Sequence, residues 1–322
     1  MIFYAPFELY HTFVLEERWG YNKTTLKTWI EDKVKGLLLN CVFTTLLLAG
    51  LTKIILWAGE QQFYYYCTGF GMVFFIFIQL LFPNFIGPMF YKFTNLGENP
   101  DETVRERELE LLEDIKEVAK EVNFPLGKTF VIDGSKRSAH SNAFFFGICG
   151  KKMVVLFDTL LHKDDEGKNK QENSEIAGIL CHEFGHWYYQ HNLVNMGVMF
   201  TMMFVFLKLS QFFLFELNMY LSFGCKEKDI LIGLILFMPL LTPVAKAFSL
   251  INVKITRMME FQADRFALRF KRQDALVRAL VKLFKSSQAD LDPDPLYATL
   301  NFSHPTLIER IRQLDELTKK DK

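Results

Sequence analysis

The strongest chemical signal in the sequence is His-Glu-Phe-Gly-His at residues 182–186. On a helix, His182 and His186 lie one turn apart, ~6 Å along the axis, so both imidazoles can bind one ion. Glu183 then lies beside the ion, where it can accept a proton from a water molecule whose pKa bound zinc lowers to about 7. The motif therefore predicts one zinc ion held by His182 and His186, with Glu183 as general base. The alternative is a helix that merely buries two histidines.

A catalytic zinc site needs a third protein ligand and one open position. Metzincins place a glycine and then a third histidine at fixed spacing after the second one, but this chain has Tyr189 and Asn192 there. His191 is expected to point elsewhere, because five residues along a continuous helix place it about 140° round the axis from His186.

The better candidate for the third ligand is acidic. Residues 254–270 predict a charged helix in which Glu260 and Asp264 are four positions apart and share one face. Glu260 can ligate the metal, while Asp264 accepts the free N–H of a ligating histidine. An ordinary solvated pair of acids is the alternative.

The elements that must position these residues include four apolar stretches. These stretches are residues 37–58, 63–86, 193–217 and 229–253. Each is long enough to cross a bilayer, which takes about 20 residues. They predict two membrane hairpins, the first with a tight turn at 59–62. The second hairpin would return 254–322 to the side of 87–192, so that Glu260 can reach the two histidines. The alternative is a set of buried core helices.

Charge and composition limit the orientation and the function class. Basic residues flank the predicted spans on the side of 87–192, whereas the opposite loop, 218–228, holds only Lys226 and Lys228. The positive-inside rule therefore predicts that the polar segments are cytosolic. Lys+Arg and Asp+Glu both number 37, which excludes a basic nucleic-acid binder, so no nucleic acid is expected as a partner. The five cysteines show no paired spacing, so a disulfide scaffold is not expected.

The polar segments predict a small soluble domain. Residues 101–123 have the apolar spacing of an amphipathic helix. Short β-rich runs follow at 128–133, 142–148 and 152–157. The predicted fold is a mostly α integral membrane protein, with four transmembrane helices and a cytosolic zinc metalloprotease domain that contains a small β-sheet. Its predicted segments are 1–92 and 193–253 in the membrane, and 93–192 and 254–322 in the protease domain.

The chain resembles the type I CAAX prenyl endopeptidases, a family of integral-membrane zinc metalloproteases. The matching segments follow the family's order along nearly the whole chain: HTFVLEERWGYN (11–22), GSKRSAHSNAFFFG (134–147), VVLFDTLL (154–161), HEFGHW (182–187), EFQAD (260–264) and SHPTLIERI (303–311). The resemblance implies that His182, His186 and Glu260 bind zinc and that Glu183 is the general base. It also implies a location in the endoplasmic reticulum membrane or the inner nuclear membrane.

Two further site residues follow from the resemblance. Asn142 matches an asparagine at a strand edge that holds the substrate backbone, and an extended peptide bound there would add a strand to the sheet. His304 matches a histidine beside the scissile bond, where it could stabilise the tetrahedral oxyanion with Arg310 as its support. The alternative for this segment is that Ser303, His304 and Pro305 simply begin a helix.

The resemblance implies that a membrane-embedded enzyme removes the last three residues of prenylated CAAX proteins or peptides. Two alternatives remain: a membrane quality-control zinc protease acting on unprenylated substrates, and a catalytically silent, truncated form acting as a scaffold. The family has more membrane spans than are predicted here, and the resemblance begins after its first ones. The chain is therefore expected to lack the family's N-terminal spans.

Overall fold

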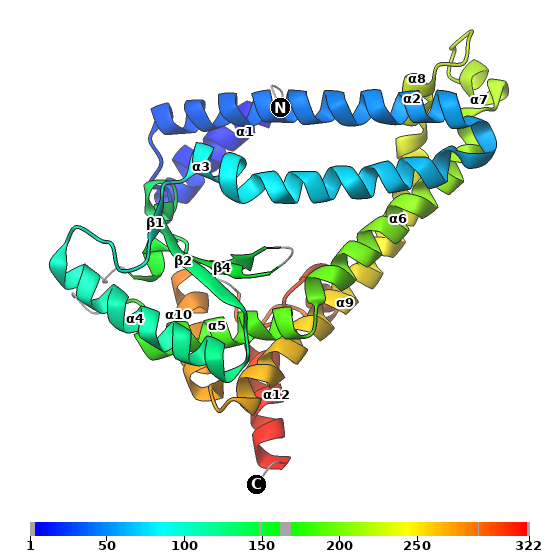
Figure 1. Ribbon diagram of the computed structural model, residues 1–322. Coiled ribbons are helices and arrows are strands. Elements are labelled where there is room, and N and C mark those ends of the chain that lie inside the picture. Colours follow the sequence, from blue (N-terminus) through cyan, green and yellow to red (C-terminus); the bar gives the residue numbers. More distant parts are fainter. Residues whose placement is uncertain (1–3, 148–149, 162–168, 289, 321–322) are drawn as a thin grey trace. The chain divides into compact units, whose positions relative to one another are not determined.

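The structure is a computed structural model and describes residues 4–147, 150–161, 169–288 and 290–320 (Figure 1). The chain divides into two compact units. One unit, here called the catalytic unit, comprises Met1–Lys35, Phe82–His191 and Thr256–Lys322. The other, the membrane unit, comprises Gly36–Leu81 and Asn192–Ile255. The predicted segment 1–92 is thus shared between the two units.

Among the described residues, three helical stretches are long and apolar enough to cross a membrane: Leu26–Phe90, His191–Leu214 and Ile230–Arg269. The first contains both of the first two predicted spans, because helix α2 (Leu26–Leu81) has non-helical backbone at Gly59, with φ 66° and ψ −178°. Glycine adopts positive φ without steric cost, and Figure 1 shows α2 turning back on itself. Only Gly59 leaves the helix, so the predicted turn at 59–62 is too long. The stretch ends with the π-helical turn η3 (Phe82–Ile86) and α3 (Gly87–Phe90).

The third and fourth predicted spans differ from the structure at their ends. Helix α6 covers His191–Leu214 and is followed by the short α7 (Leu217–Ser222). The fourth span is not one helix but α8 (Ile230–Phe237), a 3-10 turn η6 (Met238–Leu241) and α9 (Thr242–Arg269). Pro239 lies in η6 and Pro243 near the start of α9, and proline lacks the N–H that a continuous helix would need. The predicted helix at 254–270 is the C-terminal part of α9.

Within the membrane unit, α2 packs against α6 through a small apolar cluster. Leu214 of α6 is fully buried together with Ile55, Phe63 and Cys67 of α2. Tyr64 completes this cluster.

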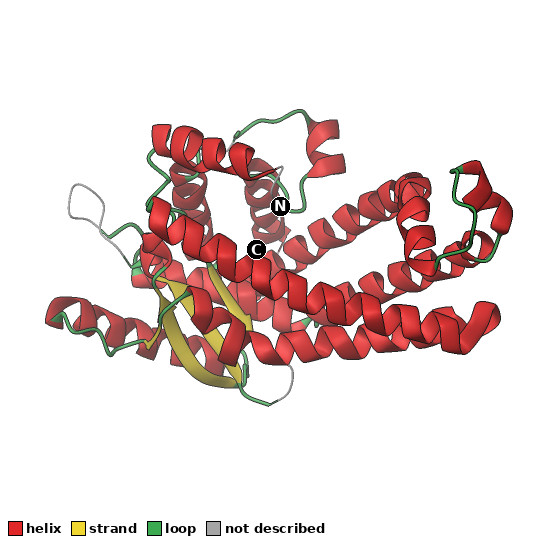
Figure 2. Cartoon of the chain, turned by 90° about the horizontal axis from the view of Figure 1, so that it is seen from above, coloured by secondary structure: helices red, strands yellow, loops and turns green. Residues whose placement is uncertain are grey.

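The catalytic unit contains a four-stranded sheet, and helices account for most of the rest of the chain (Figure 2). The strands are β1 (Phe93–Asn95), β2 (Leu126–Ile132), β3 (Ala143–Phe146) and β4 (Lys152–Phe157), in the order β1-β2-β4-β3. β2 and β4 are parallel, and the outer strands pair antiparallel with them. The three predicted strands are present, although residue 148 lies outside the described residues. β1 was not predicted because three residues are too few to show a period.

Helix α4 (Glu102–Glu121) is the predicted amphipathic helix, and Asp101 caps it by accepting hydrogen bonds from two backbone N–H groups. Its residues Leu111, Ile115 and Val118 are buried, as the apolar spacing predicts. They form the core with α5 (Asn173–Tyr188), α10 (Gln273–Ser286), β2 and β4. This core supports α5, which carries the His-Glu-Phe-Gly-His motif.

The remaining elements are short or lie at the ends of the chain. They are α1 (Ala5–Tyr10), η2 (His11–Glu16), η4 (Gly134–Lys136), η5 (Asp158–Leu160), α11 (Pro295–Asn301) and α12 (Leu307–Lys320). The fold is therefore a mostly helical membrane protein with a small sheet, as predicted.

Candidate metal centre

The two histidines of the motif lie on α5, which begins with a capping box. Glu172 is the N-cap. Its side chain accepts a hydrogen bond from the backbone N–H of Glu175, and the Glu175 side chain accepts one from the backbone N–H of Glu172. The helix then places His182 and His186 on one side, and their Nε2 atoms approach to 3.1 Å.

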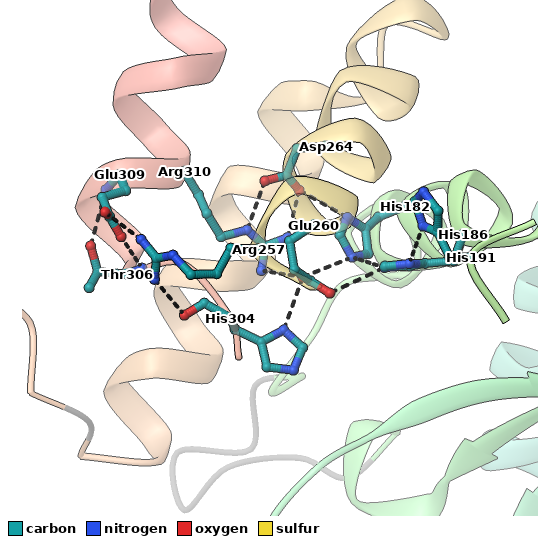
Figure 3. Close-up of polar contacts among 10 residues, drawn as sticks. All are labelled: His182, His186, His191, Arg257, Glu260, Asp264, His304, Thr306, Glu309 and Arg310. Carbon is teal, nitrogen blue, oxygen red and sulfur yellow. Dashed lines mark hydrogen bonds and ion pairs between the residues drawn. The ribbon is translucent and has the colours of Figure 1, made fainter. Parts of the chain in front are cut away.

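Helix α9 brings Glu260 to the same point. One carboxylate oxygen of Glu260 is 3.6 Å from Nε2 of His182, and the other is 3.4 Å from Nε2 of His186. One ligand atom from each of the three residues lies within 4.8 Å of the others. His182 and Glu260 are buried, with 6% and 3% of their surface exposed. Figure 3 shows the three side chains pointing toward one another.

The hydrogen bonds around the histidines show what these atoms can hold. Nδ1 of His182 is 2.9 Å from the carboxylate of Asp264, which can only accept, so this nitrogen carries the proton. Nδ1 of His186 contacts Nδ1 of His191 at 2.8 Å, and Nε2 of His191 donates to the Gln262 side-chain oxygen at 2.9 Å. His191 therefore accepts from His186. In both ligand histidines Nε2 is left with a lone pair.

Two imidazole lone pairs and a carboxylate thus converge in a buried space. Oxygen Oε2 of Glu260 is buried, and its near neighbour on the cavity side is Nδ1 of His304, at 3.0 Å. Three electron-pair donors this close repel one another unless a cation lies among them. Two imidazoles and one carboxylate also form the ligand set of catalytic zinc sites with an open fourth position. The residues present fit a divalent metal ion.

A small cavity of about 140 Å³ opens beside these ligands, lined among others by Asn142, Glu183, Glu260 and His304. Burial raises the pKa of the Glu183 carboxyl, although the two histidines of the motif act against this effect. A carboxyl with a raised pKa is a better base than an exposed one. The cavity therefore brings together all the residues to which the sequence gave a catalytic or substrate-binding role.

Asn142 lies immediately before β3, which is an edge strand of the sheet. Its backbone carbonyl accepts from the Phe157 N–H at 3.0 Å, and its side-chain oxygen accepts from the Ala143 N–H at 2.8 Å. The residue is exposed. An edge strand leaves one row of backbone groups available for an extended peptide.

His304 lies in the loop before α12, two residues before the Thr306 cap of that helix. The segment therefore leads into a helix, but His304 is not in its first turn. Its Nδ1 is 3.0 Å from Oε2 of Glu260, and its side chain is 66% exposed. The hydrogen bond with Glu260 raises the pKa of the His304 imidazole. His304 is therefore a hydrogen-bond donor at the edge of the cavity.

Arg310 differs from the role that the resemblance suggested. Its guanidinium binds both carboxylate oxygens of Asp264, at 2.8 and 2.6 Å, instead of supporting the His304 side chain. The residue that holds His304 is Arg257, which donates to the His304 carbonyl at 3.4 Å and to Glu309 at 2.6 Å. Arg257 was not predicted as a site residue, because its only signal in the sequence is its position one turn before Glu260.

Among the described residues the group that could hold a metal does not include His191, as expected, but the angle given as the reason is wrong. The angle of 140° holds only for a continuous helix, but the chain leaves the helix at Gln190, which has φ 55°. This break turns His191 back onto His186.

Comparison with known proteins agrees with this geometry. Residues 105–318 match peptidase family M48, and residues 1–92 match the family described as CAAX prenyl protease N-terminal, five membrane helices. The chain is 38% identical to the probable CAAX prenyl protease 1 of Schizosaccharomyces pombe, over 98% of this chain and 63% of that protein. It is 38% identical to CAAX prenyl protease 1 of Saccharomyces cerevisiae, over 98% of this chain and 70% of that protein.

Comparison with solved structures finds a relative of the same kind. The crystal structure of S. mikatae Ste24p superposes with a TM-score of 0.85 and 37% identity, covering 97% of this chain and 72% of that chain. The chain thus spans about two thirds of the length of its relatives. Their similarity covers both the membrane helices and the unit that contains the metal ligands. The chain is a membrane protein that belongs to the metallopeptidases of family M48, within the CAAX prenyl protease branch.

Proposed function

We propose that this chain is a zinc endopeptidase that removes the last three residues of prenylated CAAX proteins. The observation that carries the proposal is the convergence of His182, His186 and Glu260 on one buried point beside a cavity. The relatives named CAAX prenyl proteases support the choice of substrate. Zinc is proposed as the ion because the ligand set of two imidazoles and one carboxylate, with an open position, is typical of catalytic zinc.

The protein side chains divide the work of peptide hydrolysis. His182, His186 and Glu260 would hold the zinc ion, which when bound would supply Lewis-acid chemistry at the scissile carbonyl and lower the pKa of water. Glu183 accepts the proton of the attacking water and passes it to the leaving amine. Asp264 keeps the proton of His182 on Nδ1, and Arg310 holds Asp264 in place.

Two residues are proposed to hold the peptide. The substrate would extend along β3 as an added strand, with Asn142 contacting its backbone. His304 would donate a hydrogen bond to the carbonyl oxygen as it becomes negative. Its position 3.0 Å from Glu260 places this donor next to a metal ligand.

The test is cleavage of a farnesylated CAAX peptide by the purified chain, together with zinc analysis. We expect stoichiometric zinc, loss of cleavage on chelation and recovery when zinc is returned. Glu183→Gln should retain zinc and lower the rate about 10²–10⁴-fold, because it removes the general base. Equal cleavage of the unprenylated peptide would favour a broad membrane protease. Unchanged function in Glu183→Gln would favour a scaffold.

We also propose that the protein resides in the endoplasmic reticulum membrane, with the catalytic unit in the cytosol and membrane lipid around the apolar helices. The basic residues that flank the predicted spans support this orientation. In sealed microsomes, protease added from outside should cleave the catalytic unit. Full protection would place this unit in the lumen and contradict the orientation.

A further inference from the structure

His186 is held from the side opposite its metal-binding nitrogen by a chain of two hydrogen bonds. Its Nδ1 contacts Nδ1 of His191 at 2.8 Å (Figure 3). Nε2 of His191 contacts Oε1 of Gln262 at 2.9 Å. His191 is buried, with 3% of its surface exposed. None of the roles described above needs these two residues for contact with substrate or metal.

The direction of each hydrogen bond follows from Gln262. Its side-chain oxygen can only accept, so His191 carries its proton on Nε2 and has a lone pair on Nδ1. His186 must then donate from Nδ1, which leaves Nε2 as the electron-pair donor that faces Glu260 and His182. The chain of bonds therefore selects the tautomer of His186 that can bind a metal.

The backbone also shows that this contact is built into the fold. Gln190 has φ 55°, a left-handed conformation that is unfavourable for a residue other than glycine. It separates α5 from α6 and turns the His191 ring toward His186. Within five residues, α9 then supplies the ligand Glu260, the His191 partner Gln262 and the His182 partner Asp264.

We propose that His191 and Gln262 are positioning residues that hold His186 in the tautomer and ring orientation required by the metal. The inference rests on the zinc site proposed above. In this arrangement α9 orients both ligand histidines, His182 directly through Asp264 and His186 indirectly through Gln262 and His191. Loss of such outer partners typically weakens metal binding about 10–100-fold.

The experiment measures the zinc dissociation constant of the full chain in detergent, by competition with a chelating fluorophore. His191→Phe keeps an aromatic ring but removes the acceptor, so it should weaken zinc binding about 10–100-fold. His191→Asn places an amide oxygen where Nδ1 lies and should recover most of the affinity. Gln262→Leu should weaken binding, whereas Gln262→Glu, which still accepts, should not.

His140→Phe is the matched control for zinc affinity. The His140 ring stacks on Tyr21 at 4.3 Å and is exposed, so the substitution should leave the dissociation constant unchanged. The thermal midpoint of each zinc-free variant reports on packing. Wild-type zinc affinity in His191→Phe would overturn the inference, as would an equal loss in His191→Phe and His191→Asn. Absence of zinc binding in the wild type would overturn both proposals. Normal zinc behaviour without peptide cleavage would overturn only the proposed function.

Discussion

Removing the Arg310 side chain should destabilise the catalytic unit strongly, even in the absence of zinc. Arg310 is 5% exposed and Asp264 is fully buried, and two hydrogen bonds of 2.8 and 2.6 Å join them. Arg310→Leu leaves the Asp264 carboxylate buried with only His182 as a neutral donor. Removal of one partner from a buried ion pair costs about 3–5 kcal/mol of the free energy of unfolding. In a unit of about 200 residues, this corresponds to roughly 6–20 °C in the thermal midpoint.

The assay is thermal unfolding of the zinc-free chain in detergent, with hydrogen exchange in α5 and α9 to assign the loss to the catalytic unit. Arg105→Leu is the matched control, because Arg105 is 41% exposed and pairs with an exposed glutamate. Such surface pairs contribute about 0–1 kcal/mol, so the control should shift the midpoint by only a few degrees. The thermal midpoint of Arg310→Lys should fall between those of Arg310→Leu and Arg105→Leu, since an ammonium cannot bind both carboxylate oxygens in the same plane.

A double variant separates the ion pair from simple packing. Arg310→Leu combined with Asp264→Leu removes both charges, so it should be more stable than Arg310→Leu alone while still binding zinc poorly. The reasoning is refuted if Arg310→Leu is no less stable than Arg105→Leu. It is also refuted if the double variant is less stable than the single one, because the unpaired carboxylate would then not be the cause.

Three further predictions concern packing, cysteine reactivity and catalysis. A Cβ on Gly185 would lie 3.0 Å from both Cα of Ala263 and Cβ of Phe266. Gly185→Ala should therefore separate α5 from α9, lower the free energy of unfolding by about 1–3 kcal/mol and weaken zinc binding. Gly197→Ala, whose added Cβ would meet nothing within 4 Å, is the control, and equal zinc affinity in both variants would contradict the prediction. Burial raises the pKa of the Cys181 thiol to about 12. About one thiol in 10⁴ is then ionised at pH 8, so maleimide should label Cys181 only after unfolding, as mass spectrometry can check; rapid native labelling would show that the thiol is accessible. His304→Ala should lower kcat about 10²–10³-fold even at saturating zinc, because this residue would donate to the oxyanion; an unchanged kcat at saturating zinc would remove it from the mechanism.

Much of the fold could be predicted from periodicity and composition. The apolar blocks predicted the helices of the membrane unit, and the spacing of Leu111, Ile115 and Val118 predicted the buried face of α4. Local exceptions were harder to predict. The break of the fourth span at η6 depends on two prolines within a strongly apolar run, and β1 is too short to have a detectable period. The end of α5 at Tyr188 and the left-handed backbone at Gln190 have no strong sequence signal, so the angle predicted for His191 was wrong.

The convergence of the candidate metal ligands could be predicted because helix geometry converts their spacing into position. His182 and His186 face one side of α5 whatever surrounds the helix, and Glu260 and Asp264 face one side of α9 for the same reason. The roles of Arg310, Arg257 and His191 were not predictable in this way. Each is defined by its partners, and these partners belong to segments far apart in the chain, such as His182 and Asp264, which are 82 residues apart.

The sequence by itself therefore determined the membrane helices and the positions of the proposed metal ligands and base on their helices, since these depend on local spacing and burial. Tertiary structure alone decided which nitrogen of each histidine faces the metal, because a tautomer is set by the hydrogen-bond partner on the other side of the ring. It also decided which arginine neutralises Asp264, since two arginines lie near the site and only packing distinguishes them.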